Sequence, residues 1–336
     1  MKLKIHALLL SVALLTGVEA KGETYALLVG INDYTSMQPS DGPRDTSRNW
    51  RDLKGAVNDA HSMAGLLRAR YRVPEKNMLL LTADAGGRCG AQGCPTRAAI
   101  MAGLEQHLLA QTEPGDQLLF YYAGHGSQVI NNRSSEQDEF DESLVPMDAV
   151  QGVADIRDKE LRQLFNRMLD RDARPVMNAD SCHSGSISRT HPVSASASRE
   201  LEPLVQALDV TGNMGQVPAS RGAVTLSASS AAQLALEKRM PDDSTRGGFT
   251  YALVKALMSA PAGESLERTF QRTEVFMKGL ALLQVPQLSA NEAHLGRPLF
   301  DHRQEPGKHD AGPVVGVISV DGDSVILQGG KDIGLY

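Results

Sequence analysis

The stretch RPVMNADSCHSG, residues 174–185, decides the fold class of the chain. Residues 174–180 lean apolar and have the length of a short strand that is buried on both faces. The following SCHSG is polar and ends in glycine, which is typical of a loop at the carboxyl end of a strand. In open α/β sheets, ligands bind at this end of the strands. The stretch therefore predicts a strand of a mostly parallel sheet, with a polar loop at the edge where chemistry tends to be placed.

Segments of the same kind alternate with helical patterns on both sides of this stretch. Strands are predicted at 24–31, 77–82, 115–124 and 222–229, and helices at 56–71, 96–111, 158–171, 249–260 and 265–282. Thr96 is expected to cap the second helix. Such alternation implies an α/β fold, in which a mostly parallel β-sheet is flanked by helices on both faces.

The N-terminus has the three parts of a secretory signal peptide. MKLK is basic, IHALLLSVALLTGV is apolar, and VEA ending at Ala20 offers a small-residue cleavage site. The apolar run is short for a membrane span, and no later segment approaches the ~20 apolar residues that a span needs. Lys21 follows the cleavage site, where a lipid anchor would require cysteine. We therefore expect residues 1–20 to be removed and the mature chain to be secreted or periplasmic.

The remaining chain reads as one domain followed by a short segment. Residues 21–303 form the expected domain, with a first part that runs to about 190 and a second part from 222 to 303. A surface connection at about 183–221, rich in Ser, Ala, Pro and Gly, joins the two parts. Residues 304–336 contain a polar linker and an alternating segment that predicts a hairpin around Asp321-Gly322. This short C-terminal β segment is too small to bury a core of its own.

The net charge and the cysteine count limit which partners, disulfide bonds and metal sites are expected. The chain of 336 residues has a formal net charge of −6, which argues against nucleic acid as the main partner. Three cysteines in an oxidising compartment leave one thiol over. Cys89 and Cys94, in a glycine-rich loop, could close a small disulfide ring and leave Cys182 free. A zinc site is not expected, because no second ligand pair with metal spacing is visible.

Cys182 is the candidate nucleophile. A lone cysteine is more often a small buried hydrophobe. A catalytic thiolate needs a partly exposed position, a base and amide donors for the developing oxyanion. The polar loop after the 174–180 strand meets the first requirement, so the question becomes whether the chain supplies a base.

His125 is the candidate base. It stands in YYAGHGSQ, at the carboxyl end of the 115–124 strand, between two glycines that allow close approach of the backbone to a substrate. The two strand ends would bring His125 and Cys182 to one edge of the sheet as a dyad. His183 is the weaker candidate, because successive side chains usually diverge.

The motifs around these residues resemble the metacaspase branch of the caspase-fold cysteine peptidases. The resemblance rests first on YAGHGS (122–127) and DSCHSG (180–185). It continues through LLVGIN (27–32), LKGAVNDA (53–60), DEFDESLVPMD (138–148), RGAVTLSAS (221–229), GGFTYALVKAL (247–257) and PQLS (286–289), and so covers roughly 23–300 in order. The separation of the histidine from the cysteine is near the ~50 residues of caspases, although the caspase pentapeptide Q-A-C-x-G is absent.

The resemblance implies a cysteine endopeptidase with a caspase-like fold and no required cofactor. Cys182 would attack the scissile carbonyl, His125 would move protons, and the backbone N–H groups of Cys182 and Gly126 would hold the oxyanion. Metacaspases cut after Arg or Lys, and Asp59 and Asp180 match their acidic S1 residues. The alternative is that Asp59 caps a helix and Asp180 merely ends a strand.

The resemblance also raises the question of calcium, which many metacaspases bind. Asp141 and Asp158 match acidic positions of that site, but Lys159 and Arg189 stand where further carboxylates are usual. Because two cations remove ligands and repel the ion, we expect activity without calcium, with Lys159 and Arg189 pairing with Asp141 and Asp158. Nearby Asp138, Glu139 and Glu142 leave a partly rebuilt site open.

Two further expectations concern processing and the alternatives. Arg189, Arg199 and Arg221 are candidate self-cleavage sites in the 183–221 connection. The leading prediction is an exported endopeptidase acting on peptides or proteins with a basic P1 residue. One alternative is a catalytically idle caspase-fold scaffold or binding domain in the cell envelope. Another is a related peptidase with a different P1 preference, against which Asp59 and Asp180 argue.

Overall fold

The structure is a computed structural model of the 336-residue chain. It describes residues 22–34, 36, 50–130, 140–181, 204–205, 216–230, 233–282, 284–301, 317–321 and 324–327. The predicted signal peptide, Cys182, Arg189 and Arg199 lie outside the described residues. Within the described parts of the chain, no helix has both the length and the apolar composition needed to cross a bilayer.

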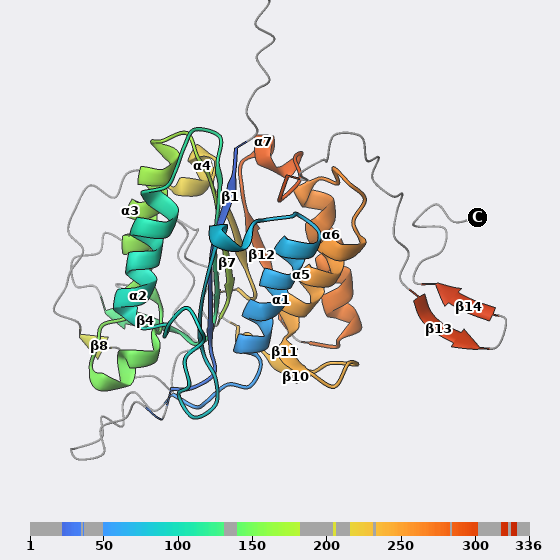
Figure 1. Cartoon of the computed structure of the whole chain (residues 1–336), viewed down its shortest axis with the longest axis horizontal. Helices are drawn as coiled ribbons and strands as arrows, with labels where there is room; N and C mark the ends of the chain where they lie inside the picture. Colours follow the sequence, from blue (N-terminus) through green and yellow to red (C-terminus); the bar gives the residue numbers. More distant parts are fainter. Residues whose placement is uncertain are drawn as a thin grey trace, which may run out of the picture.

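A six-stranded sheet runs through the centre of the domain (Figure 1). Its strands, in spatial order, are β12 (Gln287–Ser289), β9 (Val224–Ser227), β7 (Arg174–Asp180), β3 (Gln117–Ala123), β1 (Thr24–Ile31) and β2 (Met78–Ala83). Neighbours from β9 to β2 are parallel, and β12 is antiparallel to β9. The predicted mostly parallel sheet is therefore confirmed.

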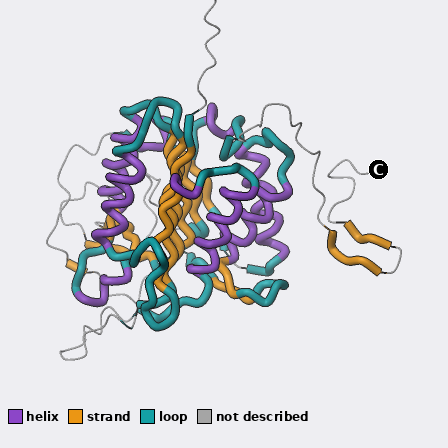
Figure 2. The backbone as a smooth tube through the Cα atoms, viewed as in Figure 1, coloured by secondary structure: helices purple, strands orange, loops and turns teal. Residues whose placement is uncertain are grey.

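Helices cover both faces of this sheet (Figure 2). On one side lie α2 (Arg97–Ala102), the π-helical η3 (Gly103–Leu109) and α3 (Asp158–Leu169); on the other lie α1 (Ala56–Ala69), α5 (Gly248–Ser259) and α6 (Leu266–Gly279) (Figure 1). Successive residues of β1 enter opposite cores: Leu27 and Val29 pack in one, Ala26 and Leu28 in the other. Burial on both faces explains why β1 is continuously apolar.

Several short elements escaped the sequence analysis. A smaller sheet has the order β6 (Ile156–Arg157), β5 (Phe140–Leu144), β4 (Gly126–Ile130) and β8 (Leu204–Val205), and β10 (Glu237–Arg239) forms a hairpin with β11 (Thr245–Gly247). The short helices are η2 (Glu75–Asn77), η4 (Met147–Gln151), α4 (Pro218–Arg221) and α7 (Glu292–Leu295). β13 (Val317–Asp321) and β14 (Ser324–Leu327) pair antiparallel, as expected for the C-terminal hairpin.

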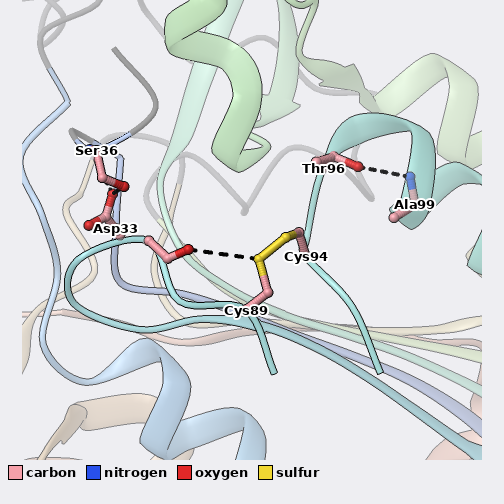
Figure 3. The surroundings of a disulfide bond; sticks show 7 residues. Asp33, Ser36, Cys89, Cys94, Thr96 and Ala99 are labelled. Atoms are coloured by element: carbon pink, nitrogen blue, oxygen red, sulfur yellow. Dashed lines mark hydrogen bonds between the residues drawn. A yellow bond between two sulfur atoms is a disulfide. The ribbon is translucent and has the colours of Figure 1, made fainter. Parts of the chain in front are cut away.

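Figure 3 shows two local features that the sequence predicted, namely a disulfide and a helix N-cap. Cys89 and Cys94 are joined by a disulfide in the loop after β2, with their Cα atoms 4.8 Å apart. Thr96 accepts a hydrogen bond from the backbone N–H of Ala99 at 3.2 Å, and so caps α2. The disulfide loop lies beside the end of β1, where the N–H of Gly86 donates to Asp33 at 2.8 Å.

Arg221 was expected to lie in an accessible linker, but the structure places it on the folded domain. It ends the helical turn α4, directly before β9. Its guanidinium donates to Asp170 at 2.6 Å and to the side chain of Asn166 at 2.9 Å, both on or next to α3. These contacts fix Arg221 on the folded domain, which makes it a poor cleavage site in the intact chain.

Candidate active site

The carboxyl ends of β1, β3 and β7 meet at one edge of the sheet, and His125 follows β3 there. The N–H of Gly124 reaches the carbonyl oxygen of Asp180 at 3.3 Å, which joins the ends of β3 and β7. A Cβ on Gly124 would lie 2.6 Å from the hydroxyl of Tyr34 and 2.7 Å from that of Tyr122. The glycine before His125 is thus required by the close approach of two tyrosines.

The same tyrosines hold the backbone of His125. Its N–H donates to the hydroxyl of Tyr34 at 2.9 Å, and the hydroxyl of Tyr122 donates to its carbonyl oxygen at 2.8 Å. Both tyrosines are fully buried, and burial raises the pKa of each hydroxyl far above its ordinary value. They therefore act as neutral hydrogen-bonding groups that fix the main chain at the histidine.

The ring of His125 is fixed by a backbone carbonyl and an indole. Its Nε2 lies 2.7 Å from the carbonyl oxygen of Arg51. Because a carbonyl only accepts, Nε2 carries the proton and Nδ1 keeps its lone pair. Trp50 stacks on the ring at 5.0 Å with an interplanar angle of 29°. Burial lowers the pKa of His125, which favours the neutral imidazole that a general base requires.

Asp59 and Asp180 meet around Gly247. Asp59 lies in the first turn of α1 and Asp180 ends β7. A Cβ on Gly247 would lie 2.9 Å from Cγ of Asp180 and 3.0 Å from Oδ2 of Asp59. The N–H of Gly247 donates to Asp59 at 2.7 Å, and the N–H and hydroxyl of Thr250 donate to Asp180 at 2.9 and 2.7 Å. The helix-cap alternative for Asp59 is wrong, since Gly55 occupies the N-cap of α1.

Neither carboxyl group is in an ion pair among the residues that the structure describes, although the charge of Arg246 lies near enough to Asp59 to offset slightly the larger effect of burial, which raises its pKa. Asp59 is 1% exposed and Asp180 is 7% exposed, and no lysine or arginine of the described residues forms an ion pair with either. Oδ1 of Asp59 has no hydrogen-bond partner there. Burial raises the pKa of Asp180 to about 6; burial, with the charge of Asp180 second, raises the pKa of Asp59 well above its ordinary value. The pair therefore needs a proton or an outside cation.

The acidic positions that resemble a calcium site are already paired with cations. Nζ of Lys159 lies 3.0 Å from Asp141 and 3.2 Å from Asp158. Arg157 approaches the second oxygen of Asp141 at 3.4 Å. Asp141 is fully buried, and the side chains of Lys159 and Arg157 are 5% and 2% exposed.

These described residues do not fit a calcium ion, which needs six to eight oxygen ligands without competing positive charge. The carboxylate of Glu142 accepts a hydrogen bond from Gln128 at 2.9 Å. Asp138, Glu139 and Arg189 lie outside the described residues. No group of three or more metal-binding side chains occurs among the residues that the structure describes.

The structure thus brings His125, Gly126, Asp59 and Asp180 to one edge, and it describes the chain up to Ser181, the neighbour of Cys182. Sequence reasoning missed the groups that support them, namely Tyr34, Trp50, Arg51, Gly247 and Thr250. Arg51 acts through its carbonyl, so no side-chain pattern could reveal it. Trp50 carried one signal, since it is the only tryptophan.

Comparison with known proteins gives consistent matches. The sequence profile described as metacaspase, peptidase C14 domain matches residues 24–190. Metacaspase-1 of Schizosaccharomyces pombe is 32% identical over 165 residues, covering 49% of this chain and 35% of that protein. Metacaspase-2 of Arabidopsis thaliana is 34% identical over 142 residues, covering 42% and 32%. Metacaspase-1 of Coccidioides immitis is 29% identical over 242 residues, covering 72% and 47%.

The chain spans from about a third to about half the length of these curated relatives. A crystal structure of a Geobacter sulfurreducens protein has a TM-score of 0.53 at 18% identity, covering 84% of this chain and 100% of that chain, which shows a shared fold. The profile match over residues 24–190, on a sheet whose edge carries His125 beside two buried carboxylates, places the chain in the metacaspase family, peptidase C14.

Proposed function

We propose that this chain is an exported cysteine endopeptidase that cleaves peptide bonds after Arg or Lys through Cys182 and His125. The observation that carries the proposal is the pair Asp59 and Asp180. Both are buried, both lie at the edge that holds His125, and neither forms an ion pair with a described side chain. A basic P1 side chain of the substrate supplies the missing charge.

The chemistry follows from the tautomer of His125. With Nε2 donating to Arg51, Nδ1 accepts the proton of the Cys182 thiol. The thiolate attacks the carbonyl carbon of the scissile bond, and the N–H groups of Cys182 and Gly126 hold the resulting oxyanion. His125 returns the proton to the leaving amine as the C–N bond breaks. Water, deprotonated by His125, then attacks the acyl carbon; the C–S bond breaks, and His125 returns the proton to the sulfur of Cys182.

Specificity follows from the charge of the acidic pair. A guanidinium or ammonium group replaces the proton that the pair otherwise binds, and it gives Oδ1 of Asp59 a donor. An aspartate side chain at P1 would bring a further negative charge into this buried acidic site and would supply no cation. The arrangement therefore favours basic P1 residues and disfavours the acidic P1 residues that caspases use.

Calcium has no role in this proposal. Lys159 contributes a positive charge between Asp141 and Asp158, so the chain itself supplies the cation at these carboxylates. We expect the peptidase to work in the presence of a calcium chelator.

Export and self-processing complete the proposal. The disulfide between Cys89 and Cys94 is consistent with folding in an oxidising compartment. Export directed by the proposed signal peptide at 1–20 would deliver the chain to such a compartment. Arg189 and Arg199 are the proposed self-cleavage sites, because Arg221 is held on the domain by Asp170. Fragments that form in the parent protein and are missing from Cys182→Ala, identified by N-terminal sequencing, test this part.

The test of the proposed function uses the mature chain beginning at residue 21 and its Cys182→Ala variant. Both are incubated with fluorogenic peptides that carry Arg, Lys or Asp at P1. We expect the parent to cleave the Arg and Lys peptides and the variant to cleave none. Cleavage by neither protein would favour the idle scaffold, and cleavage of the Asp peptide alone would favour a different P1 preference.

A further inference from the structure

Residues 50–55 form a short segment, here called the strap, that connects His125 to α1. Trp50 stacks on the ring of His125, and the carbonyl oxygen of Arg51 accepts from its Nε2. The carboxylate of Asp52 accepts from the N–H of Tyr34 at 2.9 Å. The N–H of Leu53 donates to the carbonyl oxygen of Asn32 at 2.8 Å. The first four residues of the strap are thus tied to His125 and to the end of β1.

The last two residues of the strap are tied to a single side chain from a remote part of the sequence. The carboxylate of Glu237 accepts from the N–H of Lys54 at 2.9 Å and from the N–H of Gly55 at 2.7 Å. Each oxygen takes one of these bonds, so the carboxylate grips two successive amides. Glu237 is the first residue of β10, in the part of the chain that follows the 183–221 connection.

The other strand of the same hairpin touches the acidic pair. Glu237 is paired across the hairpin with Gly247, which packs against Asp59 and Asp180. The hairpin is fixed to α1 by two more bonds: Asn58 donates to the carbonyl oxygen of Thr245 at 3.0 Å, and Arg246 donates to the hydroxyl of Ser62 at 2.7 Å. The same hairpin therefore contacts both the strap and the proposed S1 carboxylates.

We propose that Glu237 is a positioning residue that holds the strap so that the Arg51 carbonyl stays on Nε2 of His125. This keeps Nδ1 free for the Cys182 thiol, a role that rests on the proposed function. Without Glu237, two neighbouring amides lose their acceptor, and the strap turns toward water to satisfy them. The Arg51 carbonyl then leaves His125, and the ring samples the wrong tautomer.

Glu237 also has a charge that lies near the acidic pair, since its field raises the pKa of both Asp59 and Asp180. A role in attracting the substrate cation predicts a different kinetic signature. Loss of that charge would raise KM for Arg substrates and leave kcat unchanged. Loss of positioning lowers kcat and leaves KM nearly unchanged.

The test compares Glu237→Gln with Asp243→Asn. The glutamine keeps size but offers one acceptor and a repelling NH2 group to the two amides. Asp243 lies in the turn of the same hairpin, where its 82% exposed carboxylate pairs with Arg239 and does not touch the strap. Asparagine also tolerates the left-handed backbone at this position, where φ is 63°.

For Glu237→Gln we expect kcat to fall at least about tenfold, with KM within about twofold of the parent. This loss is part of the ~10²–10⁴-fold rate enhancement that a general base contributes. In the NMR spectrum of 15N-histidine-labelled protein, the Nε2–H signal of His125 should broaden and Nδ1 should show mixed tautomers. Asp243→Asn should match the parent in both measurements.

Three results would overturn the proposal: an unchanged kcat, a raised KM with parental kcat, or an unchanged His125 signal in Glu237→Gln. If the parent protein cleaves no peptide, the proposed function fails, but the NMR comparison still decides the positioning role. If Glu237→Gln proves unfolded by circular dichroism, the same comparison is made with Lys54→Pro, which removes one of the two amides and keeps the carboxylate. Parental His125 signals in that variant also overturn the proposal.

Discussion

The carbonyl oxygen of Arg51 lies 2.7 Å from Nε2 of His125, and this bond sets the chemistry of the histidine. It places the proton on Nε2 and leaves Nδ1 as the basic nitrogen. Trp50 and Tyr34 pack against the ring at centroid distances of 5.0 and 4.7 Å, so the ring has little room to turn over. The proposed catalytic histidine is thereby oriented by a backbone atom, where a catalytic triad would use a carboxylate.

Removal of one carboxylate of the proposed S1 site should slow the cleavage of peptides with a basic P1 residue selectively. For Asp180→Asn and Asp59→Asn we expect kcat/KM with an Arg peptide to fall by on the order of 10²-fold, since deletion of one partner of a buried charge pair costs roughly 2–5 kcal/mol. The control is the rate at which iodoacetamide alkylates Cys182, which should stay near the parental value. Parental Arg turnover in both variants would place the S1 site elsewhere.

The acidic pair should make the free enzyme less stable as the pH rises. The pKa of Asp180 is raised by burial to about 6 from an ordinary value of 3.8, so the folded state binds the proton more tightly than the unfolded state. Its contribution is fully present below pH 3.8 and is lost as the pH rises through about 6. The loss is about 3 kcal/mol for a shift of this size.

This pH dependence can be measured by urea unfolding of Cys182→Ala between pH 4 and pH 7.5. Asp180→Asn in the same background is the matched control. Its free energy of unfolding should decline less with rising pH, because the contribution of the Asp180 carboxyl group is removed. A peptide with a C-terminal arginine should restore stability at pH 7.5, because it supplies the cation. A free energy of unfolding that rises over this range would contradict the account of the pair.

Gly247 should tolerate no side chain. A methyl group there would press on Cγ of Asp180 at 2.9 Å and on Oδ2 of Asp59 at 3.0 Å. We expect Gly247→Ala to raise KM for Arg peptides by at least about tenfold, because overpacking of this kind costs roughly 1–3 kcal/mol. Gly65→Ala is the control, since a Cβ at Gly65 meets nothing within 4 Å. Equal KM values in the two variants would show that the contact is unimportant.

Lys159 should be essential for the stability of the folded domain. Calcium should be needed neither for this stability nor for peptidase activity. Lys159→Met leaves the buried carboxylate of Asp141 with Arg157 as its remaining cationic partner among the described residues, and breaking a buried pair costs roughly 3–5 kcal/mol. The melting temperature of the parent should not change between EDTA and millimolar calcium, and neither should its peptidase rate. A calcium-dependent rise in rate that chelation reverses would contradict this prediction.

The elements that the sequence predicted well are those whose burial is complete. β1 and β7 have the predicted bounds, because strands covered on both faces leave unbroken apolar runs. β10 and β11 were missed, since EKR and TRG are short and polar. Their pairing depends on contacts with α1 that are made only in the folded domain.

The candidate site divides in the same way. His125, Asp59 and Asp180 could be predicted as candidates because the roles proposed for them are carried by side chains, and because they stand in motifs that resemble a known family. Arg51 was missed because its backbone carbonyl carries the interaction. Glu237 was missed because nothing in the sequence links it to Lys54, whereas the fold places its carboxylate on the strap.

The central claim is that Cys182 and His125 cleave bonds after a positively charged residue. The most direct measurement is kcat/KM for two peptides that differ only in arginine or citrulline at P1, since citrulline keeps the size and removes the charge. We predict that arginine is preferred by on the order of 10²-fold or more, because the pair of Asp59 and Asp180 is otherwise left without its cation. We also predict that Cys182→Ala and His125→Ala cleave neither peptide. Equal cleavage of the two peptides, or parental activity in either variant, would contradict the account.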